Sequence, residues 1–237
     1  MFMKMRMTQV AQIEDLGPHM RRITLTGDDL TDFPLDQESA HFKAIFPQPG
    51  KTKPKLGMYF GFKKWMRSYT IRAFDKVSKA LTVDFAVNDH QGLGTNWASN
   101  AKIGDYLGIA GPGDTKHTNY NADWHLFVAD LTALPAAAAV IEKLPEDAKG
   151  AAIFQVPSAQ DKQVIRAPKG INICWVINSD LSKNALLEAL KTSTWLPGEP
   201  AIFIAGEIRQ VKQLKDFVKE MPGYTNKQTY ASGYWKA

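Results

Sequence analysis

A change of periodicity near the middle of the chain constrains the fold more than any other feature. Before about residue 113, short apolar and aromatic runs alternate with turn signals, and this spacing predicts a closed, six-stranded antiparallel barrel. The strands are predicted at residues 20–26, 40–46, 58–62, 67–72, 81–87 and 105–110.

From about Trp124 onward, strand-like runs alternate with helical ones. This pattern predicts a doubly wound parallel sheet, which binds ligands at the carboxyl ends of its strands. The polar stretch 114–121 lacks periodicity, so we expect one domain over residues 1–118 and a second over residues 119–237. In the second domain we predict strands at 125–130, 150–156, 171–179, 200–206 and 228–231, and helices at 133–144, 183–191 and 208–221.

Composition excludes several classes of protein. The longest uncharged apolar stretch near the middle, Ala133 to Ile141, is far shorter than the roughly 20 residues that a membrane span requires. The first seven residues carry cations but are not followed by the apolar region of a secretory signal. We therefore expect no membrane span and a cytoplasmic location.

Cysteine and histidine give no sign of a metal centre. Cys174 is the one cysteine and lies in a run predicted as a buried strand, so we interpret it as a small core residue. A disulfide framework and a cysteine-ligated iron–sulfur cluster are excluded. The 5 histidines lack metal-ligand spacing, and no tightly bound metal is predicted.

The net charge of +5 is unevenly spread. The segment from Ser39 to Phe74 contains no acidic residue, and such a field attracts anions. Prolines and a glycine around Lys51 to Lys55 indicate a solvated loop and not a helix that lies in a groove, so we expect no nucleic-acid partner. The cations of the segment are Lys43, Lys51, Lys53, Lys55, Lys63, Lys64, Arg67 and Arg72.

Arg67-Ser68-Tyr69-Thr70 is the most informative short motif. On an extended segment Arg67 and Tyr69 share one face, and Ser68 and Thr70 share the other. A guanidinium can bind two phosphate oxygens, a phenol can cover a ring, and a threonine hydroxyl can bond to a ring nitrogen. The motif suits the edge of a flavin, although four common residues also occur by chance in an ordinary strand with an alternating polar face.

Neighbouring segments strengthen that interpretation. Glycines in 91–101 stand just ahead of a short helix-like run, where backbone N–H groups and the helix dipole favour an anion. Residues 104–113 then form a predicted strand closed by a Gly-Pro-Gly turn. This order of motifs resembles the flavin-binding half of the ferredoxin reductase superfamily. Residues 130–136, 205–207 and 232–236 further resemble the siderophore-interacting proteins, a bacterial branch of ferric-siderophore reductases, and the resemblance runs from about Arg21 to Lys236.

The resemblance implies FAD as the cofactor. It places Arg67, with Ser68 beside it, at the pyrophosphate, Tyr69 on the isoalloxazine and Thr70 near the flavin N5. By family position, backbone groups of Asp84, Phe85, Ala86 and Val87 border the pyrimidine edge, and a following segment cups the phosphates. That segment comprises His90, Gly94, Thr95, Trp97 and Ala98.

Parts of this assignment have alternatives. The family's histidine-glycine and Gly-Pro pairs are replaced by Asn88-Asp89-His90 and Gly94-Thr95, so the alignment of His90 is open. Trp97 suits a barrel plug equally well. Asp130, Thr132 and Ala133 fall where the family contacts the cofactor, yet an Asp followed by Thr at a strand end is also an ordinary helix cap.

The second domain leaves the electron donor open. It lacks G-x-G-x-x-G, and Ala205-Gly206-Glu207 stands in place of the Cys-Gly-Pro of many relatives. Gln155 occupies the strand end where an acidic residue would hold a ribose hydroxyl, with Lys162 nearby. NADH, NADPH and reduced ferredoxin all fit. The chain stops after Ala237, so we expect Tyr234 and Trp235 to move freely over the flavin.

The resemblance also implies an anionic ferric siderophore as substrate, bound by Lys43, Lys116 and Lys236. Each lysine taken alone is equally well explained as a solvated surface residue. No catalytic acid or base is required, because the flavin performs the redox step. The leading hypothesis is a monomeric, FAD-dependent ferric-siderophore reductase that releases iron(II). The alternatives are a general NAD(P)H-flavin or ferredoxin oxidoreductase and a non-catalytic module that binds siderophores or nucleic acid.

Overall fold

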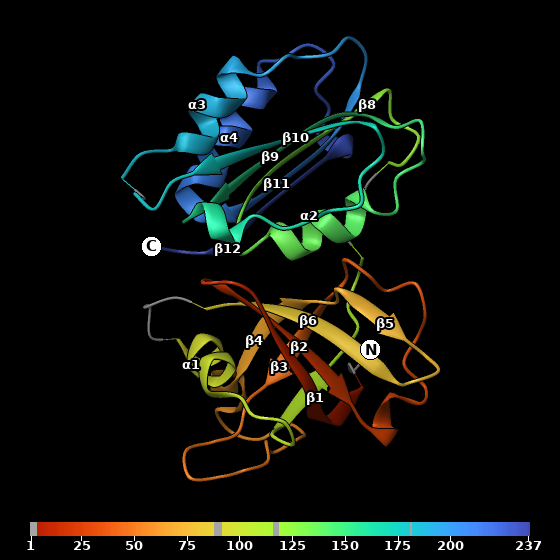
Figure 1. Ribbon diagram of the computed structural model, residues 1–237, viewed down its shortest axis with the longest axis vertical. Helices are drawn as coiled ribbons and strands as arrows, with labels where there is room; N and C mark the ends of the chain where they lie inside the picture. Colours follow the sequence, from red (N-terminus) through yellow and green to blue (C-terminus); the bar gives the residue numbers. More distant parts are fainter. Residues whose placement is uncertain (1–3, 88–91, 116–118, 181) are drawn as a thin grey trace. The chain divides into compact units, whose positions relative to one another are not determined.

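The computed structural model describes residues 4–87, 92–115, 119–180 and 182–237 (Figure 1). The chain divides into two compact units, Met1–Thr115 and Lys116–Ala237. Each is described by itself below.

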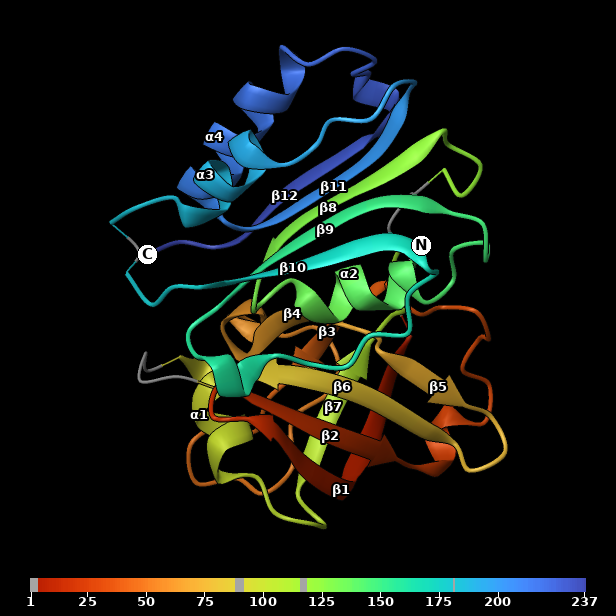
Figure 2. The same ribbon diagram turned by 45° about the horizontal axis from the view of Figure 1, so that its top comes forward.

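The first unit is a seven-stranded sheet in the order β4-β3-β7-β1-β2-β6-β5, with antiparallel neighbours throughout. Figure 2 shows its strands curving around a common interior. Its helical elements are α1 (Leu93–Asn100) and the short 3-10 helices Asp28–Leu30 and Phe62–Trp65. The strands are β1 (Met5–Gly17), β2 (Met20–Thr26), β3 (His41–Ile45), β4 (Met66–Thr70), β5 (Ala73–Asp75), β6 (Ala80–Ala86) and β7 (Tyr106–Ala110).

The antiparallel architecture is confirmed, but the six predicted strands need correction. Residues 58–62 form no strand, because the Phe62 N–H bonds to the Tyr59 carbonyl in a turn that leads into the 3-10 helix. Strands β1 and β5 were not predicted. In β1 the buried alternate positions include Arg6 and Thr8, whose polar side chains conceal the apolar periodicity of an ordinary strand.

The interior of this unit is largely aromatic. Phe42, Phe46 and Phe85 are fully buried beside aliphatic residues from every long strand. Strands β4 and β5 are the two edges of the sheet and are not paired with each other, so the described strands do not form a closed barrel by hydrogen bonds. Side chains bring its two sides together, since the Tyr69 ring on β4 lies 4.3 Å from the Phe85 ring on β6.

The second unit is a parallel five-stranded sheet in the order β10-β9-β8-β11-β12. Helices lie on both of its faces, with α2 on one and α3 and α4 on the other (Figure 1), which confirms the doubly wound prediction. The strands are β8 (Trp124–Asp130), β9 (Lys149–Val156), β10 (Gly170–Ile177), β11 (Pro200–Glu207) and β12 (Thr229–Trp235). The helices are α2 (Leu134–Ile141), α3 (Ala185–Thr192) and α4 (Ile208–Lys219), and 3-10 turns span Ala159–Asp161 and Asn226–Gln228.

Cys174 is exposed, so its interpretation as a core residue is wrong. It lies on β10, which pairs with β9 along one edge and ends the sheet on the other. Several alternate side chains of this outer strand therefore face solvent, Asn172 among them. An apolar run did not distinguish an edge strand from a central one.

Within the described residues, no helix is both long enough and apolar enough to cross a membrane.

Candidate functional site

Strand β4 places Arg67 and Tyr69 on the same face, as the extended motif predicted. Its antiparallel register pairs Arg67 with Ala44 and Tyr69 with Phe42 on β3. Because Phe42 and Ala44 are buried, this face points into the barrel. Arg67 itself is exposed, and its guanidinium donates to the backbone carbonyls of Lys64 (3.2 Å) and Met66 (2.8 Å).

Tyr69 is embedded in aromatic rings. Its centroid lies 6.3 Å from that of Phe46 and 6.5 Å from that of Phe42, in addition to the close contact with Phe85. Burial raises the pKa of the Tyr69 phenol, and the Arg67 charge opposes that rise only weakly. The phenol therefore stays protonated and can donate a hydrogen bond at any ordinary pH.

Gly94 permits a close approach between α1 and Tyr69. A Cβ atom at position 94 would lie 1.9 Å from the Tyr69 hydroxyl oxygen and 3.0 Å from the ring carbon that carries it. Any side chain larger than hydrogen would displace the phenol. The first turn of α1, whose N–H groups have no partners within the helix, is thereby held against the motif strand.

Trp97 and Ala98 face the barrel interior. The Trp97 ring lies 5.7 Å from Phe46 and 5.5 Å from Phe85, and Ala98 is fully buried. This is the packing expected of the barrel-plug interpretation of Trp97. Thr95 instead points toward β6, where its hydroxyl lies 3.5 Å from the carbonyl oxygen of Ala86.

The side chain of Asp84 is held by arginines. It is fully buried and accepts bonds of 2.7 and 2.8 Å from Arg22 on β2, with Arg72 at 3.8 Å. Its neighbour Phe85 is also fully buried in the core. The side chains of Asp84 and Phe85 are therefore engaged within the fold.

One backbone edge of β6 lacks a strand partner beyond its first residues. Strand β5 pairs only with Ala80 to Thr82, whereas β2 follows the other edge as far as Ala86. From Val83 to Ala86, no strand in the described part of the chain continues the ladder on the β5 side. On this side point the backbone groups of Asp84 and Ala86, since those of Val83 and Phe85 face β2. Such N–H and C=O groups are suited to the edge of a planar heterocycle.

Asp130 ends β8 in the second unit, and both of its carboxylate oxygens accept hydrogen bonds from neighbouring residues of that unit. One carboxylate oxygen accepts from the Thr132 N–H (2.9 Å), the Thr132 hydroxyl (2.6 Å) and the Ala133 N–H (3.3 Å). The other accepts from the Glu207 N–H (2.8 Å) and the Trp235 indole N–H (2.7 Å). Burial raises the Asp130 pKa, and the bonds donated by Thr132, Trp235 and Glu207 oppose the rise.

Asp130 therefore holds the turn ahead of α2 but is not its N-cap, which is Ala133, and the same carboxylate also joins β8 to β11 and β12. Gly206 makes this possible, since its φ is +152° and a Cβ there would lie 2.5 Å from the carboxylate. Trp235 is the last residue of β12 and has a definite partner, in contrast to the freely moving tail expected from the sequence.

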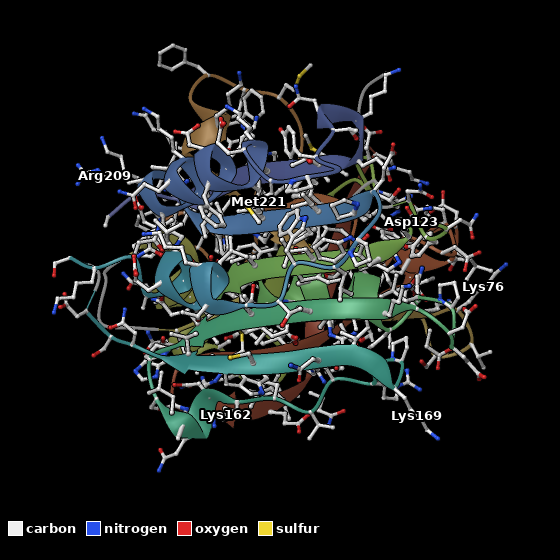
Figure 3. All side chains as sticks on the ribbon, turned by 90° about the horizontal axis from the view of Figure 1, so that it is seen from above. Lys76, Asp123, Lys162, Lys169, Arg209 and Met221 are labelled. Atoms are coloured by element: carbon white, nitrogen blue, oxygen red, sulfur yellow. The ribbon has the colours of Figure 1, made fainter. Side chains whose placement is uncertain are left out.

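Gln155 lies beside Asp130 in the register of β9 and β8. It is buried, and its amide nitrogen lies 3.5 Å from the Asn178 carbonyl, while no partner is found for its carbonyl oxygen in the described structure. Figure 3 shows Lys162 and Arg209 on the side of the sheet where the strands end. Polar and cationic groups thus gather at the carboxyl ends of the parallel strands.

The three predicted substrate lysines have different outcomes. Lys43 stands directly opposite Ser68 in the β3–β4 register, and its ammonium donates to the Ser68 hydroxyl. Lys236 follows β12 and is exposed. Lys116, like His90 of the predicted cofactor set, lies outside the described residues.

Sequence reasoning missed the partners of several residues that it selected. Arg22 as the counterion of Asp84, and Glu207 as both a donor to Asp130 and the cap of α4, were not predicted. A useful signal for Glu207 was its place just before an amphipathic helical run. The Arg22–Asp84 pair depends on strand register and had no local signal.

Comparisons with known proteins agree with this geometry. The profile described as "Siderophore-interacting FAD-binding domain" matches residues 9–116, and the profile "Siderophore-interacting protein" matches residues 122–237. The ferric vibriobactin reductase ViuB of Vibrio cholerae is 32% identical over 231 residues, which cover 93% of this chain and 85% of that protein. The NADPH-dependent ferric-chelate reductase of Escherichia coli is 27% identical, with 99% and 94% covered.

Solved structures show the same fold over the whole chain. A siderophore utilization protein from T. fusca has a TM-score of 0.88 at 32% identity, covering 99% of this chain and 93% of that one. The siderophore-interacting protein SipS from Aeromonas hydrophila also has a TM-score of 0.88 at 32% identity, covering 99% and 92%. The chain therefore belongs to the siderophore-interacting protein family and is an FAD-dependent oxidoreductase with a ferredoxin reductase-like fold.

Proposed function

We propose that this protein reduces the iron of anionic ferric siderophores and releases iron(II) in the cytoplasm. The single observation that carries the proposal is the pairing of Lys43 with Ser68. It sets a substrate-attracting cation directly beside the strand that bears Arg67 and Tyr69. The names of the vibriobactin and ferric-chelate reductases support the same reaction class.

The first unit offers groups that fit FAD. Arg67 presents an exposed guanidinium suited to the pyrophosphate. The first turn of α1, brought against Tyr69 at Gly94, offers N–H groups for phosphate, and the backbone of Asp84 and Ala86, on the β6 edge that β5 does not reach, suits the pyrimidine ring. We assign the cofactor to this set, within a domain of residues 1–118, and a nucleotide-binding-like domain to residues 119–237.

Bound FAD supplies the electron that converts iron(III) to the more weakly chelated iron(II). The protein contributes binding, orientation and charge. Thr70, buried at the end of β4, is the hydroxyl we assign to the flavin N5 region. Lys43, with Lys116 and Lys236, would draw in the anionic chelate.

The donor is proposed to act at the second unit, where β8 ends at Asp130, β11 ends at Glu207, and Gln155 is the last residue but one of β9. NADH, NADPH and reduced ferredoxin are the candidates. The name of the E. coli relative supports NADPH, and the neutral Gln155 with Lys162 and Arg209 on the same side of the sheet would tolerate a ribose phosphate. The rates of anaerobic flavin reduction by the three donors, measured by stopped-flow absorbance, rank the donors.

Trp235 sharpens the assignment of the donor side. We expect Trp235→Ala to change flavin reduction by the nucleotide more than electron transfer from prereduced enzyme to iron. Equal effects on both half-reactions, or an effect confined to the iron step, would place the indole elsewhere.

The proposal, which includes a monomeric state, is tested on the purified protein. Its visible spectrum should show flavin absorption, and joint replacement of Lys43, Lys116 and Lys236 by glutamine should slow reduction of anionic chelates most at low ionic strength. Flavin content should stay the same. If the triple variant keeps the wild-type ratio of anionic to neutral chelate reduction, the lysines do not bind substrate.

Two alternatives have distinct results in the same assays. Turnover with flavins or ferredoxin that needs no ferric chelate would indicate a general oxidoreductase. A protein that binds chelates but has no flavin absorption would indicate a non-catalytic binding module.

A further inference from the structure

The β3–β4 loop, residues 47–65, carries a cluster of charge that the proposed reaction does not use. It lies within the segment from Ser39 to Phe74, which contains no acidic residue. All of its lysines are exposed: Lys51, Lys53, Lys55, Lys63 and Lys64.

The loop is held against the barrel by its own packing. Pro54 is buried, and Leu56 lies so close to Gly108 of β7 that a Cβ there would be 2.6 Å from the leucine methyl carbon. Gln48 donates to the Tyr59 hydroxyl at 3.1 Å, and the Tyr59 and Phe62 rings lie 6.2 Å apart. The loop therefore has a defined shape and is more than solvated chain.

Two large apolar side chains project from this fixed loop. Phe60 is 105% exposed and Met58 is 63% exposed, although Tyr59 between them is only partly exposed. Single exposed apolar residues are common on protein surfaces. Here, however, an aromatic and a methionine project together from a segment in which every charged side chain is cationic.

Two of the lysines lie over aromatic rings. The Lys55 ammonium lies 4.7 Å from the centre of the Tyr59 ring, and the Lys53 ammonium lies 4.2 Å from that of Tyr106 on β7. Both lysines remain exposed. The charge of Lys55 is thus oriented beside the apolar tip, and both charges are available to an anionic surface.

We propose that the β3–β4 loop docks the protein on a bilayer rich in anionic phospholipid. Phe60 and Met58 enter the headgroup region, and the lysines bind the lipid phosphates. A bilayer accommodates a projecting tip without a preformed pocket, whereas a protein partner would need a cavity matched to Phe60. This inference goes beyond the proposed reductase activity and does not depend on it.

Co-sedimentation of the holoprotein with vesicles tests the proposal. The wild type should bind vesicles of equal parts phosphatidylglycerol and phosphatidylcholine, bind phosphatidylcholine alone poorly, and be released by high salt. Phe60→Ser should lower partitioning about tenfold. Joint replacement of Lys51, Lys53 and Lys55 by glutamine should lower it about a hundredfold, since each lysine contributes roughly fivefold near such a surface.

Val164→Ser is the matched control, because Val164 is 96% exposed but lies in the second unit. It should partition like the wild type. Equal partitioning of Phe60→Ser and Val164→Ser would overturn the proposal, as would retention on an immobilised acidic protein without any vesicle binding. Reduction of a soluble ferric chelate, measured without vesicles, tests the proposed function separately and should be the same in Phe60→Ser and the wild type.

Discussion

In the first unit, Arg67 is exposed beside an aromatic interior, whereas in the second unit Asp130 is only 6% exposed and accepts five bonds, two from β11 and β12 and three from the turn that follows β8. Both residues belong to motifs that the sequence predicts to bind the cofactor. In the antiparallel unit, Tyr69 of the motif packs among aromatic rings, whereas Arg67 is exposed and can bind a ligand. The parallel unit uses its motif carboxylate to join three strands at the place where the sheet order reverses. A motif position alone thus does not reveal whether a polar group is available to a ligand.

Asp130→Ala is expected to have the largest effect in this comparison. Removing the carboxylate leaves the Glu207 N–H, the Trp235 indole and the Thr132 N–H without their acceptor, which should lower the free energy of unfolding of the second unit by about 3 to 5 kcal/mol. Urea unfolding followed by tryptophan fluorescence measures this.

The control for that experiment is Asp123→Ala. Its exposed carboxylate accepts one bond, from the Glu199 N–H at 2.7 Å, at the opposite end of the sheet (Figure 3), so the loss should be below about 1 kcal/mol. If Asp130→Ala has the wild-type free energy of unfolding but loses FAD, Asp130 is a cofactor ligand and the contrast between the units is wrong.

Arg67→Ala should have the next largest effect, on cofactor retention and not on folding. Loss of a charge-assisted contact with the pyrophosphate should weaken FAD binding by about 1.5 to 3 kcal/mol. Bound flavin per chain after dialysis measures it. Lys64→Ala removes a nearby exposed cation and should retain the wild-type flavin content; unchanged occupancy in Arg67→Ala would remove that residue from the site.

Gly94→Ala tests the close approach of α1 to Tyr69. The new methyl group would overlap the phenol oxygen, and we expect a cost of about 1 to 3 kcal/mol in stability or FAD affinity. Tyr69→Phe in the same chain should relieve part of that cost, because it removes the overlapped atom. Gly92→Ala is the control, since the nearest atom to its Cβ is 3.8 Å away. Additive effects of the two changes would show that the contact is absent.

The smallest predicted effect concerns His125 on β8. Its ring is buried, no partner is found for Nδ1 among the described residues, and burial lowers its pKa below the ordinary 6.5. As pH falls below about 6.5, the unfolded chain takes up a proton that the folded chain resists. Stability of the second unit should therefore decline by at most about 1.4 kcal/mol per pH unit until the folded-state pKa is reached.

Thermal unfolding between pH 7 and 5.5 measures this decline. In His125→Gln the histidine contribution to the slope should disappear. A wild-type stability that rises as pH falls through this range would reverse the predicted sign.

Much of the fold was predictable from local patterns. The change from strand repeats to alternating strands and helices identified both sheets, and Arg67-Ser68-Tyr69-Thr70 marked the strand that now pairs with β3. Local patterns failed where burial did not follow polarity. Arg6 and Thr8 are buried because Arg6 donates to the Gly111 carbonyl and Thr8 to that of Leu107, and neither partner is close in sequence.

The sequence by itself determined the two sheet types, the order of the motifs and the chemistry that each motif side chain offers. Tertiary structure decided which of those side chains remain available. Strand register placed Lys43 beside Ser68 and Arg22 beside Asp84, and the meeting of three strand ends enclosed Asp130. The reason is physical: polarity and periodicity are local properties of a chain, whereas hydrogen-bond partners and burial arise between segments that only folding brings together.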